Sequence, residues 1–224
     1  MKILLVAATP LETRTLREEW GSEDPTIGKP SLLAMEGARL VLLHTGIGMV
    51  NTAYHLGRYL LGEAPDRAIQ LGIAGSFPDG PELTEVVEVS QECYAELGAD
   101  SPDKFLSLAE MGFENFRAPS GLYFNEIANP HSGQTGLRTC RGITVSRVHG
   151  TQAGIDRVVQ EWHPEVESME GAAFFQACLL AGIPFLQLRG ISNRVEPRNR
   201  SAWKIPEASR AVQDFCREYL AALV

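Results

Sequence analysis

The feature that most constrains the fold is a run of apolar residues near the start of the chain. Ile3 to Ala8 contains no polar side chain, and Thr9 and Pro10 stop it. A short apolar run without alternation is typical of a strand that is buried on both faces of a sheet. Such a strand needs helices on both sides, so this run predicts an α/β architecture.

The same succession of buried run, polar or glycine-rich end and helix recurs along the chain. Strands are expected at 31–35 and 39–45, which form a hairpin, and at 68–71, 85–90, 142–148 and 185–191. Helices are expected at 11–20, 50–61, 153–162, 170–181 and 206–223. Gly182 suits the end of the fourth helix, and Pro206 suits the start of the last.

Two details of this pattern are specific expectations. The segment Gly72-Ile-Ala-Gly-Ser76 is expected to form a turn after its strand, and 85–90 alternates as a half-exposed strand would. Residues 98–135 are rich in Gly, Pro, Asn and Ser and are the least regular part, but they lack the composition of a linker. We predict one α/β domain over residues 1–224, with a central twisted mixed sheet flanked by helices.

Composition excludes several classes of function. With 20 basic and 28 acidic residues the net charge is −8, which gives no basic surface for nucleic acid or for an anionic membrane. No apolar stretch is long enough for a signal-peptide core or a membrane span. The four cysteines form no C-x-x-C pair and have no histidine at zinc-ligand spacing, so we expect reduced thiols, no metal site and a cytoplasmic protein.

Polar residues that follow buried strands are the first candidates for a site, because ligands of α/β sheets bind beyond the carboxyl ends of the strands. Such residues occur at Glu12, at Gly72 to Ser76 and at Ser192-Asn193. Glu167-Ser-Met-Glu170, ahead of a small-residue helix, adds two carboxylates. Gly-x-Gly at 46–48 is not a complete G-x-G-x-x-G, and no P-loop is present, so no dinucleotide or other cofactor is expected.

Each candidate also has a purely structural interpretation. Glu12 could simply stabilise the first turn of a helix, and the glycines could serve tight turns. His149 could be a base or a hydrogen-bonded structural residue, and Met169 could pack in the core. Arginines 194, 198 and 200 could lie in a solvated loop or hold a carboxylate.

The order and spacing of these motifs resemble one family along nearly the whole chain. Glu12, Gly46-Ile-Gly-Met-Val-Asn51, Gly72-Ile-Ala-Gly75, Glu167-Ser-Met-Glu170 and Ile191-Ser-Asn193 are similar to motifs of the purine nucleoside phosphorylase and nucleosidase superfamily. Within it, Val166 to Ala173, Arg189 to Arg194, Arg198-Asn-Arg200 and Trp203-Lys-Ile205 resemble the futalosine hydrolases of the alternative menaquinone pathway.

The resemblance implies an enzyme that cleaves the N-glycosidic bond of a purine nucleoside, with Glu12, Glu170 and Asn193 as catalytic residues. Glu12 would deprotonate water, and Glu170 would hold the ribose hydroxyls beside the developing cation. The nucleoside would contact Ile73, Ala74, Gly75, Met169 and Ser192. The expected partners are therefore a purine nucleoside and water.

Asn193 is informative because the sister methylthioadenosine/S-adenosylhomocysteine nucleosidases have aspartate there. An aspartic acid can protonate N7 and accept from the 6-amino group of adenine, whereas an amide donates to N7 or O6 without transferring a proton. Asn193 thus favours a 6-oxopurine such as hypoxanthine, and futalosine as the substrate. The segment that contains Gln70 and Ile73 lacks the arginine and serine of the related phosphorylases, which favours water over phosphate as the nucleophile.

Several alternatives stay open. The chain could be an adenine-releasing nucleosidase for methylthioadenosine or aminofutalosine, or a nucleoside-binding module without turnover. The carboxylate of the futalosine 5′ substituent could meet Arg147, Arg194 or Arg198. The resemblance also implies a homo-oligomer, a dimer or tetramer. The irregular segment 98–135 could form a lid or an interface, and its Phe105, Phe116 and Phe124 could stack on the base or pack.

Overall fold

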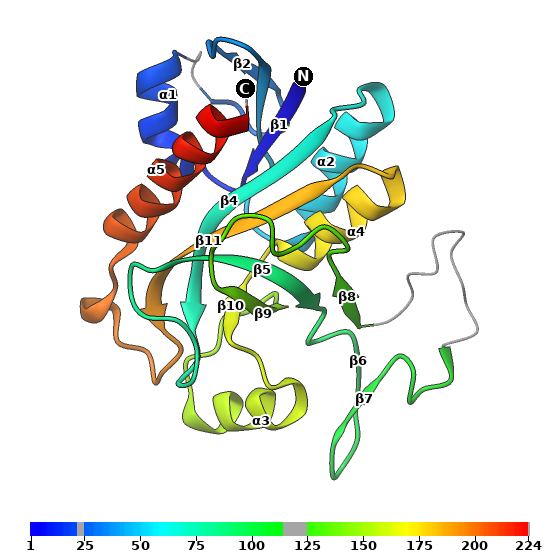
Figure 1. Cartoon of the computed structure of the whole chain (residues 1–224). Coiled ribbons are helices and arrows are strands. Elements are labelled where there is room, and N and C mark those ends of the chain that lie inside the picture. Colours follow the sequence, from blue (N-terminus) through cyan, green and yellow to red (C-terminus); the bar gives the residue numbers. More distant parts are fainter. Residues whose placement is uncertain (22–24, 114–124, 224) are drawn as a thin grey trace.

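The computed structural model describes residues 1–21, 25–113 and 125–223. Its strands are β1 (Lys2–Ala7), β2 (Ser31–Leu33), β3 (Arg39–His44), β4 (Arg67–Ser76), β5 (Val86–Cys93), β6 (Gly98–Asp100), β7 (Phe105–Ser107), β8 (Glu126–Ala128), β9 (Thr139–Thr144), β10 (Val166–Ser168) and β11 (Phe185–Arg194). Its helices are η1 (Pro10–Thr13), α1 (Arg14–Trp20), α2 (Met49–Gly62), α3 (Gln152–Trp162), α4 (Gly171–Ala181), η3 (Arg200–Ala202) and α5 (Ile205–Leu223). Figure 1 shows the sheet running through the centre of the molecule.

The described strands form one mixed central sheet and a separate small hairpin of β6 and β7. The order in the central sheet is β10-β9-β5-β11-β4-β1-β3-β2, with β8 paired to β5. Because β10 also pairs with β4, the strands β4, β11, β5, β9 and β10 close into a ring, and β1, β3 and β2 extend it as an open sheet. The predicted α/β fold with a mixed sheet is confirmed.

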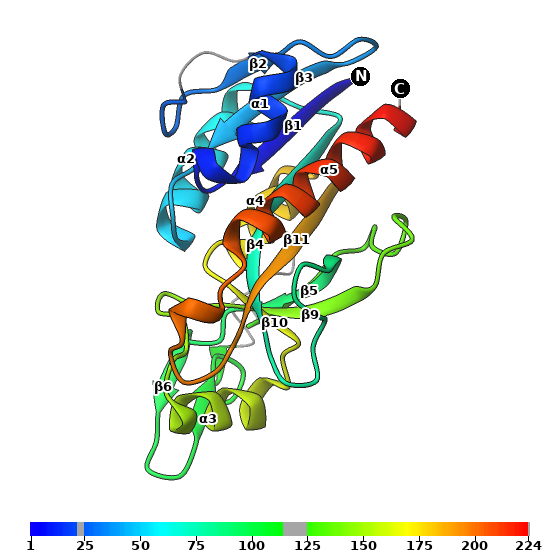
Figure 2. The same ribbon diagram turned by 90° about the vertical axis from the view of Figure 1, so that its left-hand side faces the viewer.

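Helices cover both faces of the open part of this sheet, as the first apolar run predicts. Ile3 and Leu5 of β1 pack with side chains of α1 and α5, whereas Leu4 and Val6 pack toward α2 and α4. Figure 2 shows α1 and α5 on the viewer's side of the sheet. None of the helices in the described ranges combines the length and apolar character needed to cross a membrane.

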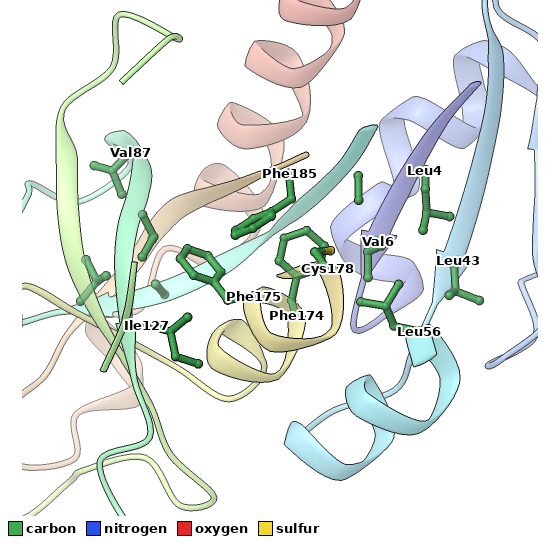
Figure 3. Packing of buried hydrophobic residues seen from close by; sticks show 14 of the residues in the cluster. Leu4, Val6, Leu43, Leu56, Val87, Ile127, Phe174, Phe175, Cys178 and Phe185 are labelled. Atoms are coloured by element: carbon green, nitrogen blue, oxygen red, sulfur yellow. The ribbon is translucent and has the colours of Figure 1, made fainter. Parts of the chain in front are cut away.

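The core on the α4 side is dominated by aromatic side chains. Phe174 and Phe175 of α4 meet Phe185 of β11 edge to face, with ring centroids 5.7 and 4.7 Å from that of Phe185 (Figure 3). Buried aromatic pairs add about 0.5–1.5 kcal/mol beyond their area burial. This packing fixes α4, and with it the residues just before its first turn.

Most predicted elements are confirmed, including the 31–45 hairpin and the end of α4 at Gly182, which has the left-handed backbone that glycine favours. The predicted helix at 11–20 begins as the 3-10 turn η1 and becomes α-helical at Arg14. Phe105 packs edge to face on Trp162, while Phe116 and Phe124 lie outside the described residues.

Two expectations were wrong. Residues 72–76 form no turn, because β4 continues through Ser76 and pairs with β11 along its length. The strand at 85–90 is not half-exposed: Glu88 of β5 is fully buried and accepts hydrogen bonds from the Gly133 N–H and the Thr135 hydroxyl. Alternation of polar and apolar residues indicates exposure only when the polar groups have no partners inside the protein.

Candidate functional site

A cavity of about 370 Å³ lies at the carboxyl ends of β1, β4, β10 and β11. This volume is within the range of small-molecule sites. The cavity wall includes nearly all the residues that the sequence singled out: Glu12, Ile73, Ala74, Gly75, Met169, Glu170, Ser192, Asn193, Arg194 and Arg198. Arg147 is the exception, since it lines an adjoining cavity whose wall also includes His149 and Arg198. These strands, of which β1 and β11 run parallel to β4 and β10 runs antiparallel to it, bring four distant stretches of sequence to one place.

Glu12 is held by Thr9, which precedes η1, and by the backbone of Ile73 in β4. One carboxylate oxygen accepts the Thr9 N–H at 2.8 Å and the Thr9 hydroxyl at 3.0 Å, and the other accepts the Ile73 N–H at 3.3 Å. Burial raises the pKa of Glu12, the nearby Glu170 carboxylate raises it further, and Arg189 opposes both. A buried carboxylate with a raised pKa is a stronger base than an exposed one.

Glu170 is the N-cap residue of α4 and lines the same cavity as Glu12. Its Oε1 accepts the Gly48 N–H at 2.9 Å, and its Oε2 lies 3.9 Å from Nη1 of Arg189. Gly48 has φ of 94°, a conformation that costs little only for glycine, and this turn aims its N–H at the carboxylate. The glycines at 46–48 therefore do serve a turn, and that turn positions an active-site side chain.

Arg189 is the functional residue that sequence reasoning missed. It is 1% exposed, and its Nη2 donates to Gln70 Oε1 at 3.0 Å and to Ser168 Oγ at 3.3 Å. A charged residue inside the buried strand 185–191 was itself the signal, because a fully buried arginine requires anionic or polar partners. Arg189 supplies the positive charge that allows Glu12 and Glu170 to lie close together.

Gly72 and Gly75 are required by close approach and not by a turn. A Cβ on Gly72 would lie 2.4 Å from Nη1 of Arg189 and 2.8 Å from Oε1 of Glu12. A Cβ on Gly75 would lie 3.0 Å from Nδ2 of Asn193. Both distances at Gly72 are shorter than real Cβ contacts, so glycine leaves the space that the charged groups occupy.

Asn193 follows a bulge in β11, and its amide is oriented by its neighbours. Its Oδ1 lies 2.8 Å from the Ser192 hydroxyl, and its Nδ2 donates to the Arg194 carbonyl at 3.0 Å. An amide nitrogen carries two hydrogens, so one N–H remains for a ligand. The side chain therefore presents a donor to the cavity.

His149 and Glu167 form a hydrogen-bonded pair in the cavity wall. Glu167 Oε1 accepts the His149 backbone N–H at 3.0 Å, and its Oε2 contacts the ring nitrogen Nδ1. Glu167 is 4% exposed. Of the two interpretations of His149, a base or a hydrogen-bonded structural residue, the contacts with Glu167 show the hydrogen bonding, and they hold the ring in place in the cavity wall.

The two arginines in the cavity wall have different partners. Arg194 donates to Ser76 Oγ at 3.1 Å and to the Pro81 carbonyl at 2.9 Å, and it pairs with Glu82. The guanidinium of Arg198 instead stacks on Trp203, 5.2 Å from the ring centroid. Arg194 therefore anchors a loop, whereas Arg198 and Trp203 present an aromatic and cationic surface at the cavity. In the described part of the chain, no three potential metal ligands lie together.

Sequence comparison extends these observations to known proteins. Residues 2–224 match the phosphorylase superfamily. A futalosine hydrolase of Thermus thermophilus is 33% identical over 84% of this chain and 84% of its own length. A futalosine hydrolase of Streptomyces coelicolor is 29% identical over 96% of this chain and 93% of its own length.

Structural comparison agrees on the fold. A 5′-methylthioadenosine/S-adenosylhomocysteine nucleosidase of Streptococcus pneumoniae, solved with a transition-state inhibitor, superposes with a TM-score of 0.80 at 20% identity and full coverage of both chains. The superposition shows the fold, and the sequence match over residues 2–224 shows that the chain belongs to the phosphorylase superfamily.

Proposed function

We propose that this chain hydrolyses the N-glycosidic bond of futalosine and releases hypoxanthine and dehypoxanthine futalosine. The observation that carries the proposal is the cavity in which two buried carboxylates, Glu12 and Glu170, lie beside an amide donor, Asn193. The identity of 33% to a futalosine hydrolase supports the same substrate. Cleavage moves the bonding electron pair to the base and leaves a ribosyl cation, which water captures at the anomeric carbon.

In this proposal the two carboxylates have different roles. Glu12 takes the proton of the attacking water, and its raised pKa suits that role. Glu170 accepts hydrogen bonds from the ribose hydroxyls and places negative charge beside the developing cation. Met169, next to Glu170 in the cavity wall, packs against the sugar. Arg189 keeps both carboxylates in position without lining the cavity itself.

Water is favoured over phosphate as the nucleophile because the described cavity wall is acidic. It includes the carboxylates of Glu12, Glu167, Glu170 and Glu196. Its arginines are Arg194, which is already bonded to the loop at 81–82, and Arg198, which stacks on Trp203. A phosphate anion near Glu12 and Glu170 would face repulsion from both carboxylates.

Asn193 favours hypoxanthine as the leaving base. Its free N–H donates to O6 or N7, whereas the 6-amino group of adenine would place a donor against this donor. Aminofutalosine and methylthioadenosine, the alternative substrates, have a 6-amino group in place of the O6 acceptor that would match this donor. A binding module without turnover would have no use for a buried carboxylate beside a positioned second one.

The 5′ substituent is assigned to Arg198 and Trp203. Arg194 is committed to Ser76, Pro81 and Glu82, and Arg147 lines only the adjoining cavity. Arg198 lines both cavities, so it can meet a carboxylate on a chain that leaves the ribose. The Trp203 ring offers a flat apolar surface to an aromatic group on the same chain.

The remaining proposals concern the protein as a whole. We propose a cytoplasmic enzyme that folds as a single domain, since its four cysteines are free and buried, as in a reducing compartment. We also propose a homo-oligomer, a dimer or tetramer, because Val50, Tyr54 and Leu61 of α2 are largely exposed. A single-chain mass in light scattering would contradict the oligomer.

Product analysis tests the proposed reaction. Purified enzyme is incubated with futalosine in phosphate-free buffer and in phosphate buffer, and the products are separated by chromatography. Hydrolysis predicts hypoxanthine and the same free sugar product in both buffers. A sugar 1-phosphate in the phosphate reaction would show phosphorolysis instead, and the absence of any released base would remove the proposal.

A further inference from the structure

The roles proposed above leave the pair of His149 and Glu167 unused, although it lies in the wall of the same cavity. Both oxygens of Glu167 are bonded to one residue: Oε1 accepts the His149 backbone N–H, and Oε2 contacts the ring at Nδ1. Burying a carboxylate is unfavourable, and this one, with 4% exposure, makes both of its contacts with a single histidine, one to the backbone and one to the ring. Such an arrangement indicates a ring whose orientation matters.

The contact with Glu167 fixes which ring nitrogen carries hydrogen. A carboxylate only accepts hydrogen bonds, so Nδ1 must donate to it. In the neutral ring, Nε2 then has a lone pair and acts as an acceptor. The pair therefore offers an acceptor, in contrast to the donor that Asn193 presents.

The sheet places Glu167, which holds the His149 ring, and Asn193 on the two strands that flank Gly75. In β10 Glu167 pairs with Gly75, and in β11 Asn193 pairs with the same residue. Paired residues on adjacent strands point to the same face, and two strand spacings separate them by about 10 Å. Gly75 leaves room for the Asn193 amide, since a Cβ there would lie 3.0 Å from Nδ2, and Gly75, His149 and Asn193 all line the same cavity.

We infer that His149, oriented by Glu167, accepts the N1–H of the purine and selects hypoxanthine together with Asn193. The inference rests on the proposed function for the identity of the base. Hypoxanthine has acceptors at O6 and N7 and a donor at N1, which match Asn193 and His149 respectively. Adenine has a donor at its 6-amino group and an acceptor at N1, so the contacts at position 6 and at N1 are both reversed, whereas N7 remains an acceptor. His149 is a specificity-determining residue, and Glu167 is its positioning residue.

Glu167→Gln tests this inference with an isosteric change. The His149 backbone N–H still requires the amide oxygen, which leaves the amide NH₂ against Nδ1. Nδ1 must then accept, and Nε2 becomes a donor. We expect the ratio of kcat/KM for inosine over adenosine to fall by about tenfold or more, because an acceptor for N1–H becomes a donor for adenine N1. A purely structural role would lower both rates and leave the ratio unchanged, which would overturn the inference.

His149→Phe provides a second variant, with His131→Phe as the matched control at an exposed histidine. Calorimetric titration measures the binding of hypoxanthine, 1-methylhypoxanthine and adenine. Wild-type enzyme and the control should prefer hypoxanthine to its 1-methyl derivative, and His149→Phe should reduce that preference about tenfold. An undiminished preference in His149→Phe would refute the role of His149.

These binding measurements separate the two proposals. If wild-type enzyme releases no base from any nucleoside but shows the expected preference for hypoxanthine, the proposed hydrolysis fails and the recognition by His149 stands. If hydrolysis occurs and the variants keep the wild-type preferences, the hydrolase stands and the inference fails.

Discussion

Glu92 of β5 gives a quantitative prediction about stability. Its side chain is 1% exposed, and Oε2 accepts the Thr144 hydroxyl at 2.8 Å. Burial raises its pKa to about 7 from an ordinary value of 4.5, against the opposing effects of Arg189 and the hydrogen bonds. Between these two pH values the folded protein binds more protons than the unfolded chain, so the free energy of unfolding falls as pH rises through that window.

The size of the effect follows from the two pKa values. Each unit of difference between the folded and unfolded pKa corresponds to about 1.4 kcal/mol. Ionisation of Glu92 therefore lowers the free energy of unfolding by about 3 kcal/mol at pH 8, and it has no effect at pH 4, where Glu92 is protonated in both states. Glu92→Gln keeps the shape of the side chain and removes its charge. The free energy of unfolding of the variant, measured relative to that of wild type, should therefore rise by about 3 kcal/mol between pH 4.5 and pH 8.

Urea unfolding of both proteins at pH 4.5, 5.5, 6.5, 7.5 and 8.5 measures this difference directly. Subtracting the two curves removes the contributions of all other titrating groups. Glu126→Gln, an exposed carboxylate at β8, serves as the control and should show no such pH dependence. A constant difference between Glu92→Gln and wild type across the range would refute the reasoning that Glu92 is charged at a cost above pH 7.

Three further predictions concern the cavity. Glu12→Gln should lower kcat at least about 100-fold without abolishing nucleoside binding, whereas the exposed Glu18→Gln should match wild type; retained turnover in Glu12→Gln would exclude it as the base. Arg189→Met removes the cation that opposes the raised pKa of Glu12, so the acidic limb of the kcat/KM profile should move to higher pH; a profile identical to wild type would contradict this coupling. Asn193→Asp should shift the preference from inosine toward adenosine, and an unchanged ratio of their rates would refute the role of the amide.

The sequence predicted the fold well because the run at 3–8 is apolar along its length and the run at 185–191 is mainly apolar. Burial on both faces leaves little choice of architecture for such runs. The error at 72–76 has a different cause. The glycines were interpreted as a turn, but Gly72 and Gly75 are required by the side chains of Arg189 and Asn193 on the neighbouring strand β11. Information of that kind depends on contacts between segments far apart in the chain.

Of the site, the sequence predicted the residues that follow strands but not those that support them. Glu12, Glu170 and Asn193 were found because they stand at strand ends and resemble family motifs. Arg189 was missed because it lies within a strand, where a charge has meaning only once its partners are known. The bond between His149 and Glu167 joins residues 18 positions apart, and neither position alone indicates the other.

The central claim is that this cavity hydrolyses a 6-oxopurine nucleoside, futalosine, in preference to its 6-amino counterpart. The most direct test is the kcat/KM of one enzyme preparation for futalosine and aminofutalosine, with the released base quantified in phosphate-free buffer. The account predicts hypoxanthine release with a kcat/KM at least about tenfold above that for adenine release. Equal or faster release of adenine, or no release from futalosine, would contradict it.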